Sequence, residues 1–270
     1  MTLSRRDISE LLTANGLAPR RALGQNFVAD PNTVRRIARL ARVGPGDRVV
    51  EIGAGLGSLT MALAETGAQV TAVEVDRGLV PVLRGLVEPL GIDVVEADAM
   101  TVDWLALLGD GPWVLVANLP YNVATPLVVD LLEGVPAVER MLVMVQAEVG
   151  ERLAAAPRTG PYGAVSVLVA YWATARVAGK VPASVFVPRP RVESVLVSIE
   201  RRPTPDLDVG YDRLKEVIRA GFGHRRKMLR GSLAGVVEPE AFAAAGVDPA
   251  ARAEELGVDE WGRLAAWRRG

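Results

Sequence analysis

The chain of 270 residues contains no cysteine and a single histidine. Without cysteine it can form no disulfide and has no thiolate for chemistry, so we expect the cytoplasm as its compartment. One imidazole and no thiolate leave a transition metal too few preferred ligands, and we therefore expect no metal site.

A membrane-spanning segment is also missing from the sequence. The longest apolar run, at 164–175, is too short to cross a bilayer and is flanked by Arg158 and Arg176, so we interpret it as part of the core. Residues 1–16 contain no apolar stretch of signal-peptide length. Hydrophobic residues make up 50% of the chain and charged residues 23%, which is a globular composition.

The formal net charge is −1, which argues against a protein that coats nucleic acid without specificity. The charges are unevenly distributed, with nine arginines against four acids in residues 1–48 and five basic residues without an acid in 219–231. Concentrated positive charge on a nearly neutral chain predicts a local site for a polyanion. The alternative is that arginine serves in these segments only as a soluble surface residue.

Short valine-rich runs recur from Arg48 onward, at intervals that can hold a helix or a crossover. They read "RVVEIG", "QVTAVEVD", "IDVVEAD", "PWVLVAN" and "RMLVMVQAE". This alternation predicts an α/β fold with a parallel sheet covered on both faces. A last strand is expected in "FVPRPRVESVLVSIE", before the linker "RRPTPDLD".

From Tyr211 the pattern is helical throughout, including "PAARAEEL" at 249–256. We therefore expect two domains. An α/β domain at 1–203 carries a basic N-terminal segment at 1–47, and a small all-α domain occupies 204–270.

The expected strand ends carry polar residues, and ligands of open parallel sheets bind beyond such ends. The first strand ends in the glycine loop "EIGAGLG", the second in "VEVD" with Glu74 and Asp76, and the third in "EADAM" with Asp98. A glycine loop, an acid for ribose hydroxyls and an acid for an adenine amine together fit an adenosyl ligand. A tight turn and solvated acids are the alternatives.

The fourth strand ends in "NLPYNVATPL", beginning at Asn118. Pro120 fixes its own φ and restricts Leu119 to extended geometry, which aims the Leu119 carbonyl and the Asn118 amide in fixed directions. An amino group with two N–H donors could bond to both oxygens, and Tyr121 offers a ring on which a purine can stack. These residues are candidates for holding an adenine by its exocyclic amine.

Several motifs in order resemble the ribosomal RNA adenine dimethyltransferases, over nearly the whole chain from about Arg20. They are "LGQNFVAD", "EIGAGLGSLT", "VEVD", "EADAM", "NLPYNVATPL", "FVPRPRVESVLV" and "HRRKMLRGSL". The resemblance implies a Rossmann-like class I methyltransferase sheet and S-adenosylmethionine as cofactor. Within the family the bacterial small-subunit type is most similar, which implies N6,N6-dimethylation of two adjacent adenines in the 3′-terminal hairpin loop of 16S ribosomal RNA, by a monomer.

The resemblance also assigns residues. Cofactor binding is expected for Asn26, Val28, Gly53, Gly55, Glu74, Asp98 and Asn118. Catalysis is expected at Asn118, Leu119, Pro120 and Tyr121, with Phe186 opposite Tyr121 at the target base. RNA binding is expected for Arg225, Arg226, Lys227 and Arg230. Ala54 and Val28 stand where proline and leucine are more usual, and His224 is interpreted as a surface or RNA-contacting residue.

Two alternatives stay open at this point. The first is the related methyltransferase that modifies an adenine of large-subunit ribosomal RNA and confers antibiotic resistance. The second is a noncatalytic factor that uses the same fold to bind a maturing ribosome. The complete set Glu74, Asp98, Asn118 and Tyr121 argues against the second.

Overall fold

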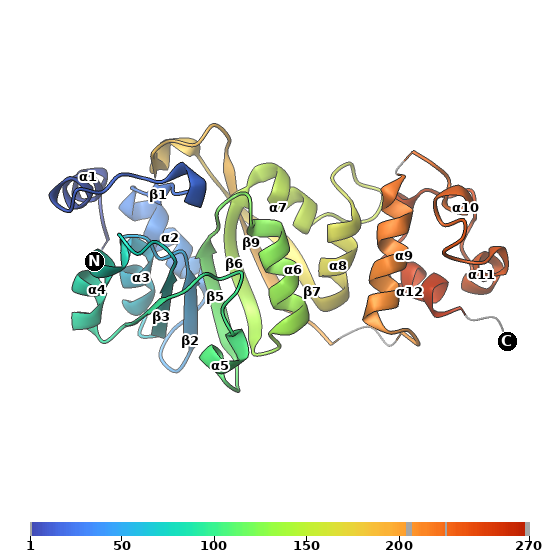
Figure 1. Ribbon diagram of the computed structural model, residues 1–270, viewed down its shortest axis with the longest axis horizontal. Helices are drawn as coiled ribbons and strands as arrows, with labels where there is room; N and C mark the ends of the chain where they lie inside the picture. The colour runs from blue at the N-terminus through green and yellow to red at the C-terminus, as the bar shows by residue number, and fades with distance from the viewer. Residues whose placement is uncertain (1, 204–206, 225, 268–270) are drawn as a thin grey trace. The chain divides into compact units, whose positions relative to one another are not determined.

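The computed structural model describes residues 2–203, 207–224 and 226–267. The chain forms two compact units, and each is built from two stretches of sequence (Figure 1). The first unit runs to Gly150 and resumes at Arg176–Arg201, whereas the second consists of Glu151–Ala175 and the residues from Arg202 onward. The expected boundary near residue 203 therefore leaves out the first stretch of the second unit.

A seven-stranded sheet forms the centre of the first unit. In spatial order its strands are β4 (Asp93–Glu96), β3 (Gln69–Glu74), β2 (Arg48–Ile52), β5 (Trp113–Asn118), β6 (Val138–Gln146), β9 (Ser194–Arg201) and β7 (Ala173–Val181). The five strands expected from the valine-rich runs are present and pair in parallel. The last expected strand, β9, is also present and pairs antiparallel with β6, so the sheet is mostly parallel.

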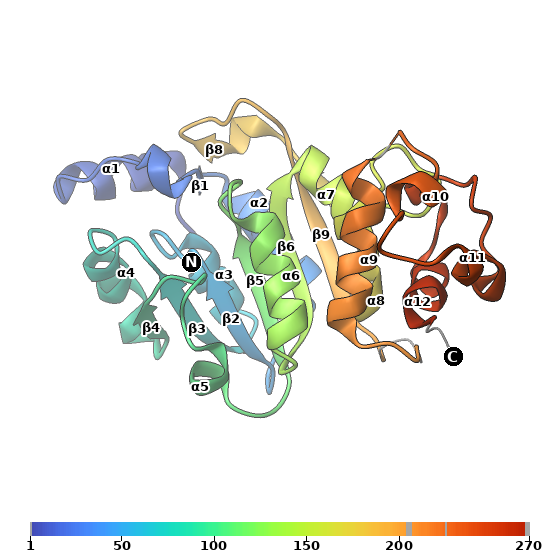
Figure 2. The same cartoon turned by 45° about the vertical axis from the view of Figure 1, so that its right-hand side comes forward.

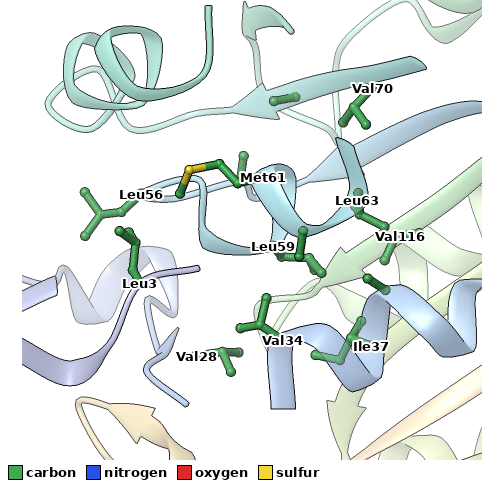
Figure 3. Packing of buried hydrophobic residues seen from close by; sticks show 14 of the residues in the cluster. Leu3, Val28, Val34, Ile37, Leu56, Leu59, Met61, Leu63, Val70 and Val116 are labelled. Atoms are coloured by element: carbon green, nitrogen blue, oxygen red, sulfur yellow. The ribbon is translucent and has the colours of Figure 1, made fainter. Parts of the chain in front are cut away.

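Helices cover both faces of this sheet, and Figure 2 shows α6 in front of it and α2 behind it. The helices of this part of the chain are α1 (Arg5–Ala14), α2 (Pro31–Ala41), α3 (Ser58–Ala64), α4 (Val80–Val87), α5 (Trp104–Leu108), α6 (Ala124–Gly134) and α7 (Ala147–Leu153). α2 begins where the Asp30 side chain accepts a hydrogen bond from the Thr33 amide at 2.8 Å. Its buried residues Val34 and Ile37 lie on the side that faces Leu59 of α3 (Figure 3).

A second, two-stranded sheet joins distant segments of the first unit. β1 (Phe27–Val28) pairs antiparallel with β8 (Phe186–Val187). The short 3-10 helix η1 (Arg21–Leu23) precedes β1, and η3 (Ala183–Val185) precedes β8. The pairing holds the segment that leads into α2 beside the chain between β7 and β9.

The second unit contains mainly helices. They are α8 (Ala164–Trp172), α9 (Tyr211–Gly223), α10 (Leu229–Ser232), α11 (Pro239–Ala245), the 3-10 helix η4 (Ala253–Glu255) and α12 (Val258–Ala266). The helix expected over 249–256 is wrong, because Asp248 turns the chain by accepting from the Ala250 amide and Arg252 is extended. No helix in the described part of the chain is long and apolar enough to cross a membrane.

Candidate cofactor and adenine site

Two adjoining hollows lie at the carboxyl ends of β2, β3, β4 and β5, and we call them together the cleft. Together with the space that is open to solvent, they enclose about 750 and 660 Å³. They share Leu23, Gly53, Val75 and Pro120. The seven residues predicted to bind the cofactor all line the cleft: Asn26, Val28, Gly53, Gly55, Glu74 and Asn118 in the first hollow, and Gly53 and Asp98 in the second.

The glycine loop turns sharply after β2. Gly53 and Gly55 have φ angles of +74° and +58°, a region that residues with a Cβ rarely adopt. A Cβ on Gly55 would lie 3.0 Å from the ring of Phe27, so the loop also packs closely against β1. Both requirements explain glycine here, and the turn leaves the loop backbone in the wall of the first hollow.

Glu74 at the end of β3 is 5% exposed and ties the loop to its strand. Its Oε2 accepts from the Gly55 amide at 2.7 Å, and its Oε1 accepts from the Asp76 amide at 2.8 Å. Burial raises the pKa of Glu74 above its ordinary value, while these two bonds favour the charged form. Each carboxylate oxygen keeps a further lone pair, so ribose hydroxyls can still donate to Glu74.

Asp76 has a different place from Glu74. It lies outside the cleft wall, with Oδ2 accepting from Gln25 Nε2 at 2.7 Å and Oδ1 lying 3.1 Å from Arg20 Nη1. Oδ1 also accepts from the Gly78 amide. Of the two acids in "VEVD", Glu74 therefore faces the cleft, and Asp76 holds the N-terminal segment 20–28 that forms part of the cleft wall.

Asp98 lines the second hollow and is exposed. Its Oδ1 accepts from the Met100 amide at 2.9 Å, which fixes the carboxylate at the end of β4. Val75 and Met100 lie beside it in the wall with exposed fractions of 42% and 38%. An acceptor next to exposed apolar side chains suits a flat base that carries an amino group.

Glu51 is a candidate that sequence reasoning missed. It lines the first hollow, is 2% exposed, and its Oε2 atom has no hydrogen-bond partner among the described residues. Burial, together with the charge of Glu74, raises its pKa to about 8. A buried carboxyl of this kind suits a cationic ligand group. The sequence could have indicated Glu51 by its position at the end of β2, directly before the glycine loop.

Asn118 ends β5 with its amide group in a fixed orientation. Its Nδ2 donates to the Asn26 carbonyl at 2.9 Å, so Oδ1 is directed elsewhere. Asn26 in turn donates from Nδ2 to the Gly24 carbonyl at 3.0 Å. In the described part of the chain, no donor is bonded to Asn118 Oδ1 or to the Leu119 carbonyl, whereas the Leu119 amide donates to Met144. Two acceptors are thus free at this strand end.

The two aromatic residues expected at the target base have different places. Tyr121 is partly exposed just beyond Pro120, and its hydroxyl lies 3.0 Å from Ser194 Oγ. Phe186 does not line the cleft: it is 1% exposed and lies in the core, because β8 pairs with β1 and directs this side chain inward. The expectation that Phe186 faces the base opposite Tyr121 is therefore wrong for this structure.

The basic residues predicted to bind RNA belong to the second unit. Arg226, Lys227 and Arg230 are exposed, as is His224, whose carbonyl accepts from the Lys227 amide at 2.8 Å. Arg225 lies outside the described residues. Over the ranges that the structure describes, no group of three or more His, Cys, Asp or Glu residues could hold a metal ion.

The described site fits an adenosyl cofactor that carries an ammonium group. The glycine loop permits close approach, Glu74 and Asp98 offer acceptors at successive strand ends, and Glu51 has an unpartnered oxygen inside the first hollow. A sheet of this strand order with such a cleft defines a Rossmann-like class I methyltransferase fold.

Comparison with known proteins gives the family. The sequence model of the protein family described as ribosomal RNA adenine dimethylase matches residues 16–269. A relative from Kineococcus radiotolerans, named ribosomal RNA small subunit methyltransferase A, is 48% identical, and the match covers 99% of this chain and 92% of the relative. A relative of the same name from Thermobifida fusca is 45% identical, with 97% and 94% covered. The chain belongs to the ribosomal RNA adenine dimethylase family.

Solved structures agree with the fold. The 23S rRNA methyltransferase ErmE has a TM-score of 0.69 and 29% identity, over 88% of this chain and 98% of its own. A dimethyladenosine transferase from Plasmodium falciparum has a TM-score of 0.72 at 21% identity, over 87% and 94%, which shows the shared fold alone.

Proposed function

We propose that this chain transfers methyl groups from S-adenosylmethionine to the N6 amines of two adjacent adenines in the 3′-terminal hairpin loop of 16S ribosomal RNA. The products are N6,N6-dimethyladenines on the maturing small subunit, formed in the cytoplasm. Family membership and relatives at 45–48% identity that are named for the small subunit support this substrate. The observation that carries the chemistry is the pair of free acceptors at Asn118 and Leu119.

Different residues of the cleft would bind different parts of the cofactor. S-adenosylmethionine, when bound, supplies a methyl group already activated on a sulfonium. Glu74 would accept from ribose hydroxyls, Asp98 would accept from the adenine amine, and Glu51 would pair with the ammonium of the methionine part, since all three line the cleft. The N-terminal segment, through Asn26 and Val28, covers the first hollow and limits access of water to it.

Positioning of the target amine is the task of the strand end. The amine of adenine is a poor nucleophile because its lone pair is delocalised into the ring. Hydrogen bonds from its two N–H groups to Asn118 Oδ1 and the Leu119 carbonyl favour a pyramidal nitrogen with its lone pair directed at the methyl group. Correct positioning of two reactants can lower a barrier by roughly 7–11 kcal/mol. The methylated nitrogen then loses its proton readily to water, because an ammonium on an aromatic ring is acidic, so the chain needs no strong general base.

The second unit is proposed to recognise the ribosome through its exposed basic residues, Arg226, Lys227 and Arg230. Phosphate contacts of this kind fix the position of an RNA without reading its sequence. Target bases in a loop are unpaired, so their extrusion toward Tyr121 costs less than it would in a duplex.

Transfer of labelled methyl groups tests the proposal. Small subunits that lack the modification and naked large-subunit RNA are incubated separately with the protein and labelled S-adenosylmethionine. We expect label on the small subunit that approaches four methyl groups over two adenines. Label only on large-subunit RNA would indicate a 23S rRNA methyltransferase, as ErmE is, and cofactor binding without transfer to either RNA would indicate a noncatalytic factor.

A further inference from the structure

Two arginines of α2 and the arginine that follows this helix have exposed side chains. Arg35 and Arg39 are four residues apart and therefore lie on one side of the helix, and Arg42 follows directly after its last residue, Ala41. The buried face of the helix, with Val34 and Ile37, packs against the core (Figure 3). The three arginines, which we call the arginine row, lie outside this buried face.

The arginine row has no acidic partner among the described residues, whereas three arginines on other helices do. Arg6 pairs with Glu10 on α1 at 2.7 Å, and Arg84 pairs with Glu88 at 3.4 Å. In α9, Arg213 pairs with Glu216 at 2.7 Å. α2 contains no acid between Pro31 and Ala41, and Asp30 before it is bonded to Thr33. Within the described residues, no hydrogen bond or ion pair engages the side chain of Arg35, Arg39 or Arg42.

Arg36, a further arginine of α2, has a structural contact that the arginine row lacks. Arg36 Nη1 donates to the Lys180 carbonyl at 2.9 Å, and its guanidinium lies against Gly179 of β7 so closely that a Cβ there would collide with it. Arg36 thus joins α2 to the sheet edge. Its three neighbours have no comparable function within the fold.

We propose that the arginine row of α2, Arg35, Arg39 and Arg42, binds the phosphate backbone of the substrate RNA. This inference rests on the proposed function, in which the substrate is RNA. α2 begins close to the cleft, because it follows β1 with only two residues between them and Val28 of β1 lines the first hollow, and Arg35 lies in the second turn of this helix. It would provide the catalytic unit with its own contact to RNA, separate from the basic residues of the second unit.

Charge and spacing both favour phosphates. Like charges four residues apart repel on a helix, and a bound polyanion removes that repulsion. Arg39 and Arg42 are partly stabilised by the negative end of the helix dipole, but Arg35, in the second turn, is not. Four helical residues rise by about 6 Å, close to the distance between successive phosphates of a strand. One guanidinium group can donate two parallel hydrogen bonds to two oxygens of a phosphate, so several arginines can each bind one phosphate.

The test is the salt dependence of binding to unmethylated small subunits. The variant Arg35→Gln/Arg39→Gln removes two members of the row and keeps Arg42, which ends the helix at a φ of +52°. Each lost phosphate contact lowers the slope of log affinity against log salt by about 0.7–0.9, so we expect a decrease of roughly 1.4–1.8. Affinity for S-adenosylmethionine should not change, because neither residue lines the cleft.

The matched control is Arg6→Gln/Arg84→Gln, which removes the same charge from two arginines that pair with acids. Its slope is expected to equal that of the wild type. Three results would overturn the phosphate contact. The salt slope could be equal in the wild type, the α2 variant and the control variant, or it could decrease equally in both variants. The α2 variant could also bind more weakly while its salt slope stays unchanged. Methyl transfer by the wild type distinguishes failure of the proposed function from failure of the phosphate contact. If the wild type does not label small subunits, the proposed function is wrong, whatever the salt slopes are.

Discussion

The hydroxyl of Tyr121 and the hydroxyl of Ser194 lie 3.0 Å apart and join the loop after β5 to the first residue of β9. Ser194 is 1% exposed and sits where β9 pairs with the end of β6. A rigid strand end thus holds the outer edge of a partly exposed ring. The contact fixes the plane on which a target adenine would stack.

We expect Tyr121→Phe and Ser194→Ala each to lower methyl transfer by about 2- to 10-fold, since one hydrogen bond contributes about 0.5–1.5 kcal/mol. Tyr121→Ala should lose more, because stacking on an aromatic ring is worth roughly 1–3 kcal/mol per base. The double variant Tyr121→Phe/Ser194→Ala should be no worse than the worse single variant. Additive losses in kcat/KM would show that the two hydroxyls act separately.

Asn118→Ala removes one of the two free acceptors and the bond to Asn26. Methyl transfer should fall by about 100-fold or more, as expected when a reacting group loses its alignment. Binding of S-adenosylmethionine, measured by calorimetry, should be retained because the other residues of the cleft remain. Normal turnover would remove Asn118 from the mechanism.

Glu51→Gln should change how stability depends on pH. The folded protein has a Glu51 pKa of about 8 against an ordinary value of 4.5, so it holds a proton that the unfolded chain releases. The contribution of Glu51 to the free energy of unfolding is therefore fully present below pH 4.5 and is lost as the pH rises toward 8. Glu51→Gln should flatten this decline in denaturant titrations of the free protein.

The same carboxyl predicts a pH-dependent affinity for the cofactor. An ammonium group beside Glu51 favours its charged form, so affinity should rise as pH approaches 8 and binding at lower pH should release a proton. Calorimetry in buffers of different ionisation enthalpy measures that proton. Glu51→Gln should release none, and proton release by the variant would assign the effect to another group.

Asp76→Asn weakens the attachment of the N-terminal segment, because Gln25 and Arg20 both contact this carboxylate. We expect the affinity for S-adenosylmethionine to fall several-fold and amide exchange around Gln25 and Asn26 to accelerate. Arg77→Gln is the control, since Arg77 pairs with Glu96 on the surface and its side chain is 88% exposed. Unchanged exchange in Asp76→Asn would show that β1 alone holds the segment.

Arg226→Ala/Lys227→Ala should weaken binding to small subunits and lower its salt dependence, because exposed cations that contact phosphates release counterions on binding. Arg252→Ala, an exposed arginine elsewhere in the second unit, is the control. An unchanged salt slope in the double variant would exclude these residues from the RNA contact.

The strands that position the site could be predicted from sequence, because most of the valine-rich runs are buried in the sheet, with β4 at its edge only partly buried, and each run ends in a polar residue. Asn118, Glu74 and Asp98 were found in this way. Glu51 was not, since its burial without a partner depends on packing that no local pattern records. Phe186 was misplaced for a related reason: its motif predicts proximity to the cleft, but the pairing of β8 with β1 decides that the ring points inward.

The interleaving of the two units limits the order in which the nascent chain can fold. β9 lies between β6 and β7 in the sheet, and β1 finds its partner only in β8. The ribosome that synthesises this chain therefore releases Asn26 and Val28 early, yet their place beside the cleft is secured only after Phe186–Val187 and Ser194–Arg201 have emerged. Cofactor binding by the growing polypeptide should begin abruptly and late, when most of the second unit is still to be made.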